Sequence, residues 1–215
     1  MIKERITKIL EELPPSVTLE VATKSRTISE IKEAISAGVK VIGENYVQEA
    51  EEKIKVIGKK VSWHLIGYLQ KNKAKKAVKL FDMIESLHSL ELARLLNREC
   101  EKIGKVMPVL IEVNIAREPQ KSGVYPEEVE NLVKDIGELK NIKLQGLMTM
   151  GPFLENPEEL RPYFKKMREI FISLKSKFKN AEWKYLSMGM SSSYKIAIEE
   201  GANLIRIGTL IFGKR

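Results

Sequence analysis

The residue in this sequence that points most directly to covalent chemistry is Lys24. It follows a short apolar and β-branched stretch, Leu19–Ala22, and the segment Ser25–Thr27 after it is typical of a helix start. We therefore expect Lys24 at the C-terminal end of a strand. An amine whose stem lies among apolar neighbours loses its proton more easily than one in water, and a neutral amine attacks an aldehyde. Lys24 is thus a candidate for bonding an aldehyde-bearing molecule.

A second group of residues, near the C-terminus of the chain, has the composition of a phosphate site. Gly189 and Gly208 would expose backbone N–H groups, and Ser191 and Thr209 would add hydroxyl donors at adjacent strand ends. A helix is expected to start at Ser191, so this residue could equally be an ordinary N-cap. Backbone amides, hydroxyls and a helix N-terminus together attract a phosphate, and such sites recur after the last two strands of parallel barrels.

Arg206 precedes Gly208 by two residues in the last predicted strand. Its guanidinium keeps its charge, so a buried position requires an acceptor. A pyridine nitrogen and an acidic side chain are both candidates, and the residues themselves do not decide between them. Lys24, the phosphate site and Arg206 together suit a phosphorylated heteroaromatic aldehyde, and pyridoxal 5′-phosphate (PLP) fits that description.

The elements that must position these residues alternate between strands and helices. An opening helix is followed by eight candidate strands: Val17–Ala22, Val39–Ile42, Ser62–Ile66, Met83–Glu85, Met107–Val113, Lys143–Gly146, Trp183–Leu186 and Leu204–Ile207. Strands joined by crossover helices pair in parallel, which leaves an open doubly wound sheet or a closed barrel. Eight repeats in 215 residues favour a single-domain TIM (β/α)8 barrel with an extra N-terminal helix, spanning residues 1–215. No G-x-G-x-x-G follows the first strand, which counts against a dinucleotide-binding sheet.

The site of a parallel barrel lies at the C-terminal ends of its strands, and the residues found there are small, polar or basic. The positions that stand at or just past the eight predicted strands are Lys24, Asn45, His64, Ser86, Asn114, Met148 with Met150, Ser187, and Arg206. A barrel built for packing alone would not need this pattern. We therefore expect these side chains to surround a shared site.

Composition excludes several other classes of protein. Cys100 lies in a helical apolar pattern and is expected to be a buried thiol, and the two histidines, His64 and His88, are not at metal-ligand spacing. The sequence therefore predicts no metal. The N-terminal segment lacks the apolar core of a signal peptide, and no apolar run approaches the roughly 20 residues of a membrane span. A cytoplasmic protein without membrane attachment is expected.

The net charge of +8 would suit an anionic partner, and its densest part is the lysine-rich segment 71–79. A solvated helix face explains this segment as well. Nucleic-acid binding stays an alternative, but no nucleic-acid motif supports it, and a basic face alone predicts only salt-sensitive association.

Several long motifs together identify a family resemblance. They are GENYVQE at 43–49, WHLIGYLQKNK at 63–73, KSG at 121–123, GLM at 146–148, LSMGMS at 186–191 and IRIGTLIFG at 205–213. Over nearly its whole length the sequence resembles the pyridoxal phosphate homeostasis protein family. It departs from the family at Thr23, where a serine is usual, and at Ser192 and Ser193, where acidic residues are common.

The resemblance implies a barrel like the N-terminal domain of bacterial alanine racemase, with PLP held as a Schiff base on Lys24. It implies that Arg206 faces the ring nitrogen and that Ser191, Gly208 and Thr209 hold the phosphate. The family is known for binding PLP and for effects on vitamin B6 and amino-acid balance, without an established reaction. The cofactor-binding residues that we expect are Lys24, Asn45, His64, Met148, Ser187, Ser191, Arg206, Gly208 and Thr209.

The residues also bear on whether the chain is a carrier or an enzyme. An arginine opposite the ring nitrogen makes a poorer electron sink than a carboxylate, and racemisation needs a second acid or base opposite Lys24. In the racemases a tyrosine of a second domain supplies it, whereas none of the six tyrosines here follows an obvious strand end. We expect a monomeric carrier that delivers PLP to apo-enzymes. The alternative is a slow amino-acid racemase with His64, or a nearby tyrosine, as the second base.

Overall fold

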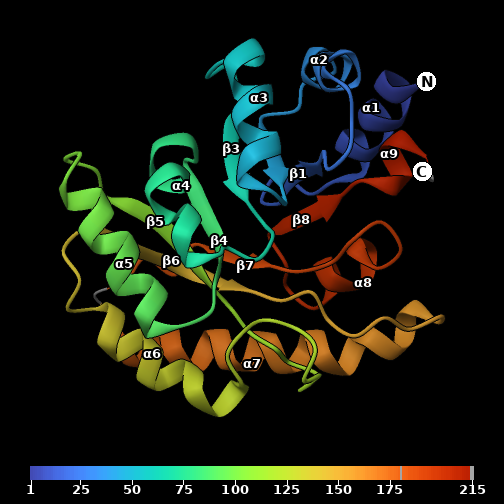
Figure 1. The fold of residues 1–215 in the computed structure, drawn as a ribbon. Coiled ribbons are helices and arrows are strands. Elements are labelled where there is room, and N and C mark those ends of the chain that lie inside the picture. The colour runs from blue at the N-terminus through green and yellow to red at the C-terminus, as the bar shows by residue number, and fades with distance from the viewer. Residues whose placement is uncertain (180, 214–215) are drawn as a thin grey trace.

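Eight parallel strands form a closed barrel in the computed structural model, which describes residues 1–179 and 181–213 (Figure 1). The strands follow one another around the barrel in chain order, and β8 pairs with β1. Their bounds are β1 Thr18–Ala22, β2 Val41–Glu44, β3 Ser62–Leu65, β4 Met83–Leu87, β5 Met107–Glu112, β6 Ile142–Met148, β7 Tyr185–Ser187 and β8 Leu204–Ile207. The predicted TIM barrel is confirmed, and the open sheet is excluded.

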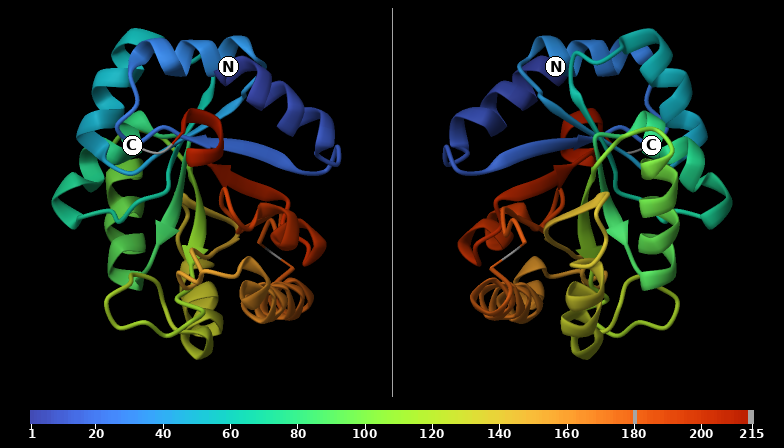
Figure 2. Two further views of the ribbon diagram at one scale, coloured as in Figure 1. Left: turned by 90° about the vertical axis from the view of Figure 1, so that its right-hand side faces the viewer. Right: turned by 90° about the vertical axis from the view of Figure 1, so that its left-hand side faces the viewer.

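The helices cover the outside of the strands, as both views in Figure 2 show. Their bounds are α1 Ile2–Glu12, α2 Ile28–Ser36, α3 Val47–Ile57, α4 Ala74–Leu80, α5 Leu90–Glu101, α6 Val129–Ile136, α7 Arg161–Lys177, α8 Tyr194–Glu199 and α9 Thr209–Phe212, with short 3-10 turns at Lys71–Lys73, Pro126–Glu128 and Pro157–Leu160. Outward-facing strand residues such as Val21, Trp63 and Ile205 pack against the apolar faces of these helices and form the main core. Each helix in the described part of the chain is too short or too polar to cross a lipid bilayer.

The extra N-terminal helix α1 packs beside the end of the chain. It buries Ile6 and Ile9 and contacts α2 and α9, and Arg5 Nη1 donates to the backbone oxygen of Ile211 at 2.9 Å. In Figure 1, α1 accordingly lies beside α9. Helix α1 therefore helps to hold the segment after β8 in place.

The predicted elements match the observed ones, with strand bounds shifted by a residue or two. The 3-10 turn Pro157–Leu160 runs directly into α7, and Leu160, Phe164 and Met167 on the inner side of this segment are buried. Cys100 is a fully buried thiol, as expected. One helix start was placed wrongly: α8 begins at Tyr194, not at Ser191.

The barrel interior has an apolar floor. Met83, Leu110, Met148 and Leu204 form a cluster of their own, separate from the main core, with Tyr185 packed against it. Four of these five residues precede, by two positions in their strands, a polar side chain that points the same way because strand side chains alternate. Polar side chains therefore lie between this floor and the C-terminal ends of the strands, which we call the mouth of the barrel.

A glycine in β6 allows the strands on that side to pair. At Gly146 the register between β5 and β6 shifts, φ is +144°, and an added Cβ would lie 1.8 Å from the backbone oxygen of Tyr185 in β7. The contacting atom is backbone, so a side chain here would have to push β6 and β7 apart. Gly104 also has a positive φ, +62°, but an added Cβ there meets nothing within 4 Å.

We expect Gly146→Ala to lower the free energy of unfolding by about 3 kcal/mol or more, since it combines backbone strain with a clash between strands. Gly104→Ala is the matched control and should cost only about 1 kcal/mol, the usual penalty for a left-handed residue that has a Cβ. Urea unfolding of the two variants measures both values. Equal losses would show that the contact with Tyr185 does not limit this strand pair.

Candidate functional site

Lys24 lies two residues past the end of β1, at the mouth of the barrel, and is half-buried. Its Nζ stands 5.0 Å from the centroid of the Tyr46 ring, within cation–π range. Tyr46 follows β2 by two residues, so the expectation that no tyrosine stands at a strand end is wrong. The signal was present in the sequence, because Tyr46 lies one residue after Asn45 in the same motif.

The turn that carries Lys24 is tied to α3. Lys53 Nζ donates to the backbone oxygen of Thr23 at 2.6 Å, and the carboxylate of Glu49 accepts from the backbone N–H of Ser25 at 2.5 Å. Lys53 also pairs with Glu44 at 2.6 Å and with Glu49 at 2.7 Å. Sequence reasoning missed this network, since a lysine four residues after a glutamate is common on solvated helix faces.

The residues of the predicted phosphate site lie together at the adjacent strand end. Ser191 Oγ accepts from the backbone N–H groups of Gly208, at 3.3 Å, and Leu210, at 3.2 Å. An added Cβ on Gly208 would lie 3.2 Å from the backbone oxygen of Ala22, so this glycine packs directly against the end of β1. The hydroxyl of Ser191 therefore caps α9 across the mouth, instead of starting its own helix. We call Ser191, Gly208, Thr209 and Leu210 the amide cradle.

Gly189 supports the cradle from behind. Its φ is +91°, and an added Cβ would lie 2.5 Å from the Cβ of Ala197 in α8. The backbone at Gly189 also accepts a hydrogen bond from the N–H of Arg206 at 3.0 Å, which links the loop after β7 to β8. Thr209, the first residue of α9, is exposed at the mouth.

Arg206 points into the barrel and is almost fully buried. Its guanidinium donates to the backbone oxygen of Thr149 at 2.7 Å and makes a short contact with the hydroxyl of Ser187. The Sδ of Met150 lies 3.6 Å from Nη2. Among the described residues its acceptors are thus a backbone oxygen and a hydroxyl, and no carboxylate is a direct partner.

An inner polar layer continues from Arg206 across the barrel. We define it as Glu20, His64, Glu85, Glu112, Ser187 and Arg206, which come from six of the eight strands. Ser187 Oγ donates to Glu85 Oε2 at 2.6 Å, and Glu85 Oε1 lies 2.8 Å from His64 Nδ1. Glu20 Oε1 lies farther away, 3.3 Å from the same nitrogen, and neither Glu20 oxygen has a well-formed hydrogen bond among the described residues. We infer that the Nδ1 proton is directed at Glu85.

Burial and mutual charge set the titration of this layer. Burial, with the charge of Glu85, raises the pKa of Glu20 to about 7, although His64 and Arg206 oppose the shift. Burial disfavours a charged imidazole, but the carboxylates of Glu20 and Glu85 outweigh it and raise the pKa of His64 to about 10. Burial also opposes ionisation of Glu85, yet His64, Arg206 and Ser187 hold its pKa below the ordinary value. Burial raises the pKa of Glu112.

The ligand atoms of Glu20, His64 and Glu85 lie within 4.8 Å of one another, close enough for one cation to touch all three. The imidazolium of His64 already supplies a cation there. Sequence reasoning included His64, Ser187 and Arg206 but missed the three glutamates. The available signal was a single charged residue inside each apolar strand, since Glu is otherwise depleted from strands.

The remaining residues that we expect to bind the cofactor, Asn45, Met148 and His64, lie at different depths in the barrel. Asn45 stands at the mouth after β2, and an added Cβ on Gly67 would lie 2.4 Å from the Asn45 backbone oxygen, so the loops after β2 and β3 touch there. Met148 lies inside the barrel on the apolar floor and is fully buried. His64 is likewise inside, within the inner polar layer. Met150, two residues beyond Met148, is the methionine of this segment that reaches the mouth.

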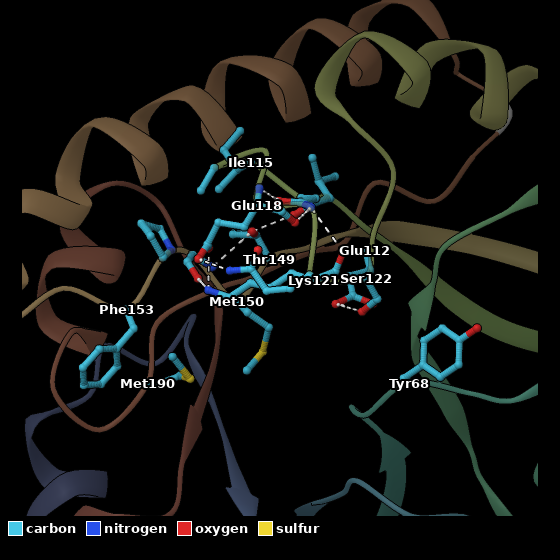
Figure 3. Close-up of a pocket in the computed structure, with 16 residues that line it drawn as sticks. Tyr68, Glu112, Ile115, Glu118, Lys121, Ser122, Thr149, Met150, Phe153 and Met190 are labelled. Atoms are coloured by element: carbon cyan, nitrogen blue, oxygen red, sulfur yellow. Dashed lines mark hydrogen bonds and ion pairs between the residues drawn. The ribbon is translucent and has the colours of Figure 1, made fainter.

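A large cavity lies beside these residues, over the ends of β5 and β6. Its volume is about 700 Å³, and Glu112, Asn114, Thr149, Met150 and Met190 are among its lining residues. In Figure 3, Tyr68 stands across the opening from Phe153 and Met190. Among the described residues, the lining does not include Lys24 or the amide cradle. The candidate site therefore lies at the ends of β1 and β8, with Lys24 and the amide cradle. The cavity adjoins it at Met150, which lines the cavity and whose Sδ lies 3.6 Å from Arg206 Nη2.

The basic segment 71–79 forms a 3-10 turn and α4 on the outside of the barrel. Lys71 pairs with Glu91, and Lys76 pairs with Glu51 at 2.7 Å, while their side chains stay about half exposed. Part of the positive charge is therefore balanced locally, as on a solvated helix face.

Comparison with known proteins assigns the chain to a family. Residues 2–215 match the model of the alanine racemase N-terminal domain. The chain is 41% identical over 223 residues to the pyridoxal phosphate homeostasis protein of Aquifex aeolicus, covering 99% of this chain and 97% of the relative. It is 39% identical to the protein of the same name from Haemophilus influenzae, covering 93% and 86%.

Solved structures agree with this assignment. PipY of Synechococcus elongatus PCC7942 without PLP superposes with a TM-score of 0.94 at 35% identity, covering 99% of this chain and 100% of that one. The PipY structure with PLP bound gives a TM-score of 0.92 at 34% identity, with the same coverage. Alanine racemase of Clostridium difficile 630 shares the fold at 16% identity, with a TM-score of 0.80, and this chain spans 56% of its length. The chain therefore belongs to the alanine racemase N-terminal domain family and, within it, to the pyridoxal phosphate homeostasis proteins.

Proposed function

We propose that this protein binds PLP at the mouth of the barrel and holds it for delivery to apo-enzymes, as part of vitamin B6 homeostasis in the cytoplasm. In this proposal Lys24 bonds the aldehyde, the amide cradle holds the phosphate, and Arg206 lies on the side of the ring nitrogen. The observation that carries it is that Gly208, at the end of β8, packs against Ala22, the last residue of β1, two residues before Lys24. The relatives named for PLP homeostasis, and the PipY structure with PLP bound, support it.

The residues at the mouth fit a phosphate. Ser191 Oγ accepts from two backbone N–H groups, so its own hydrogen remains available to donate to another acceptor. Gly208 brings backbone so close to Ala22 that a side chain would crowd the opening. Lys24 stands beyond the same strand end. These groups can contact the two ends of one small molecule that carries both an aldehyde and a phosphate.

When bound, PLP supplies an aldehyde that condenses with a primary amine to form a C=N bond and one water. The protein would contribute an amine at a fixed place and a counter-site for the phosphate anion. Such a bond is reversible, because water or another amine can displace the lysine. This property suits a reservoir: the aldehyde is kept from reacting with other amines and can still be released.

The racemase alternative loses one of its candidates in this geometry. His64 is enclosed in the inner polar layer, and its pKa of about 10 keeps it protonated at neutral pH, so it cannot accept a proton there. Tyr46 is the tyrosine that lies against Lys24, and it is about half exposed. We therefore propose the carrier function.

The first prediction concerns the bond to Lys24. Protein loaded with PLP should absorb in the near-visible, and borohydride should fix the cofactor on the peptide that contains Lys24. Lys24→Ala should abolish both signals, whereas Lys32→Ala, which removes an exposed lysine from α2, should leave them intact. Labelling of Lys32 or other surface lysines in wild-type protein, with Lys24 unmodified, would overturn the assignment.

The second prediction concerns the amide cradle. Ser191→Ala should weaken PLP binding about tenfold, because one hydrogen bond to an anion is lost, and should leave the affinity for pyridoxal unchanged, because pyridoxal has no phosphate. Fluorescence titration with the two ligands measures this difference. An equal loss for both ligands would show that Ser191 acts on the general shape of the mouth and not on the phosphate.

The third prediction tests the charge state of the inner polar layer through stability. Folding raises the pKa of Glu20 from 4.5 to about 7, so the wild-type protein loses stability as the pH rises between these values, by at most about 3 kcal/mol. Glu20→Gln has no such titration. The free energy of unfolding of Glu20→Gln, relative to that of the wild type, should therefore increase between about pH 5 and pH 8.

Glu85→Gln is the control with the opposite sign. In the wild type the pKa of Glu85 is held below the ordinary value, so ionised Glu85 stabilises the fold above pH 4.5. The substitution should therefore destabilise the protein at neutral pH. Urea unfolding across this pH range measures both variants. A difference between Glu20→Gln and the wild type that stays constant with pH would contradict the proposed charge state.

A further inference from the structure

We propose that Lys53, acting with Glu49, is a positioning residue for Lys24: it fixes the turn that aims the Lys24 amine across the mouth of the barrel. This inference rests on the proposed function, because it concerns the residue that would bond the aldehyde. It adds a role for two residues of α3 that do not reach the mouth themselves.

The contacts grip the turn on both sides of Lys24. Lys53 Nζ donates to the backbone oxygen of Thr23, the residue before Lys24, at 2.6 Å. Glu49 accepts from the backbone N–H of Ser25, the residue after it, at 2.5 Å. Both peptide groups that flank Lys24 are thereby tied to one helix.

The backbone of this turn needs such support. Ser25 has a φ of +60°, a left-handed conformation that is unfavourable for a residue with a Cβ. The side chain of Ser25 is exposed, so packing does not enforce the conformation. Two hydrogen bonds hold it: a backbone bond from the Arg26 N–H to the Thr23 oxygen at 3.0 Å closes the turn, and the bond from the Ser25 N–H to Glu49 ties the turn to α3.

Lys53 acts through the turn and not on a ligand. It is 4% exposed, and its ammonium group makes three hydrogen bonds, to the Thr23 oxygen, Glu44 and Glu49. An ammonium group has three donors, so none remains for a molecule at the mouth. Glu44 is fully buried in β2 and also receives a short hydrogen bond from the Thr23 hydroxyl, which anchors the network to the barrel.

The chemistry explains why such a grip would matter. Bond formation requires the amine to approach the aldehyde carbon along a narrow range of directions while the phosphate is held elsewhere. A lysine side chain has four rotatable bonds, so its amine can already occupy many positions. Movement of the backbone at Lys24 would increase the number of these positions. Fixing the peptide groups on both sides removes that increase.

The test compares two glutamates of α3. Glu49→Ala removes the acceptor for Ser25, whose N–H can turn to water, so the fold should persist. Glu51→Ala is the matched control: it has the same substitution on the same helix, and Glu51 pairs with Lys55 and Lys76, away from the turn. Lys53→Met is the second variant, which keeps the stem and removes the three donors; urea unfolding first checks that it is folded.

The readout separates the bond from ligand binding. We expect Glu49→Ala and Lys53→Met to slow the appearance of the near-visible band with PLP about tenfold. Both should bind 4-deoxypyridoxine 5′-phosphate, which has the phosphate but no aldehyde, as the wild type does, and Glu51→Ala should match the wild type throughout. Bond formation at the wild-type rate in Glu49→Ala, or an equal loss for both ligands, would overturn the proposal.

A ligand-free readout distinguishes this proposal from the proposed function. Reductive methylation with formaldehyde and borohydride can be followed by mass spectrometry at Lys24, with Lys32 as the internal reference. Glu49→Ala should change the Lys24-to-Lys32 rate ratio severalfold and Glu51→Ala should not. If wild-type protein forms no bond with PLP, the proposed function fails, while an unchanged rate ratio in Glu49→Ala would refute the positioning role alone.

Discussion

Pairing between β1 and β8 is the interaction on which the rest of this structure depends. The first and last strands are about 180 residues apart in the chain, yet Val21 pairs with Ile207 and the two strand ends meet. This pairing closes the barrel, removes both sheet edges, and brings Gly208 against Ala22, two residues before Lys24. Helix α1 and the Arg5 contact with Ile211 strengthen the same seam from outside. Without closure, Lys24 and the amide cradle would stand at opposite edges of an open sheet.

Closure also creates the electrostatic problem that the inner polar layer solves. Arg206 cannot give up its charge, and a barrel interior offers it no water. A series of hydrogen bonds runs from Arg206 through Ser187 and Glu85 to His64. The negative charge of Glu85 therefore lies between the two positively charged side chains. Glu20 is left with poor hydrogen bonding, and its raised pKa lets it take up a proton more readily than an exposed carboxylate. The layer thereby holds Arg206 in position directly beneath the mouth.

Two rigid supports therefore lie under the site, one for each end of the proposed ligand. The inner polar layer fixes Arg206, and the α3 network of Lys53, Glu44 and Glu49 fixes the turn around Lys24. The large cavity over β5 and β6 is lined mainly by loop residues, and Glu112 is the residue of the inner polar layer that reaches it. The two hydrogen-bonded networks thus lie where a small molecule would be bonded. They leave the neighbouring space open toward solvent.

The sequence by itself determined the order of strands and helices, the closed barrel and the residues of the mouth, because alternation of apolar residues and position past a strand end are local properties. Lys24, Ser191, Gly208 and Arg206 were recognisable in this way. The tertiary structure alone decided which partners these residues meet: Thr149 and Ser187 for Arg206, the α9 amides for Ser191, and Tyr46 for Lys24. It also revealed the glutamates inside the barrel and the contact of Lys53 with the turn around Lys24. Such contacts join strands far apart in the chain. The local sequence around a glutamate in a strand is the same whether barrel closure places the side chain beside a histidine or leaves it in water, so the sequence alone cannot distinguish the two.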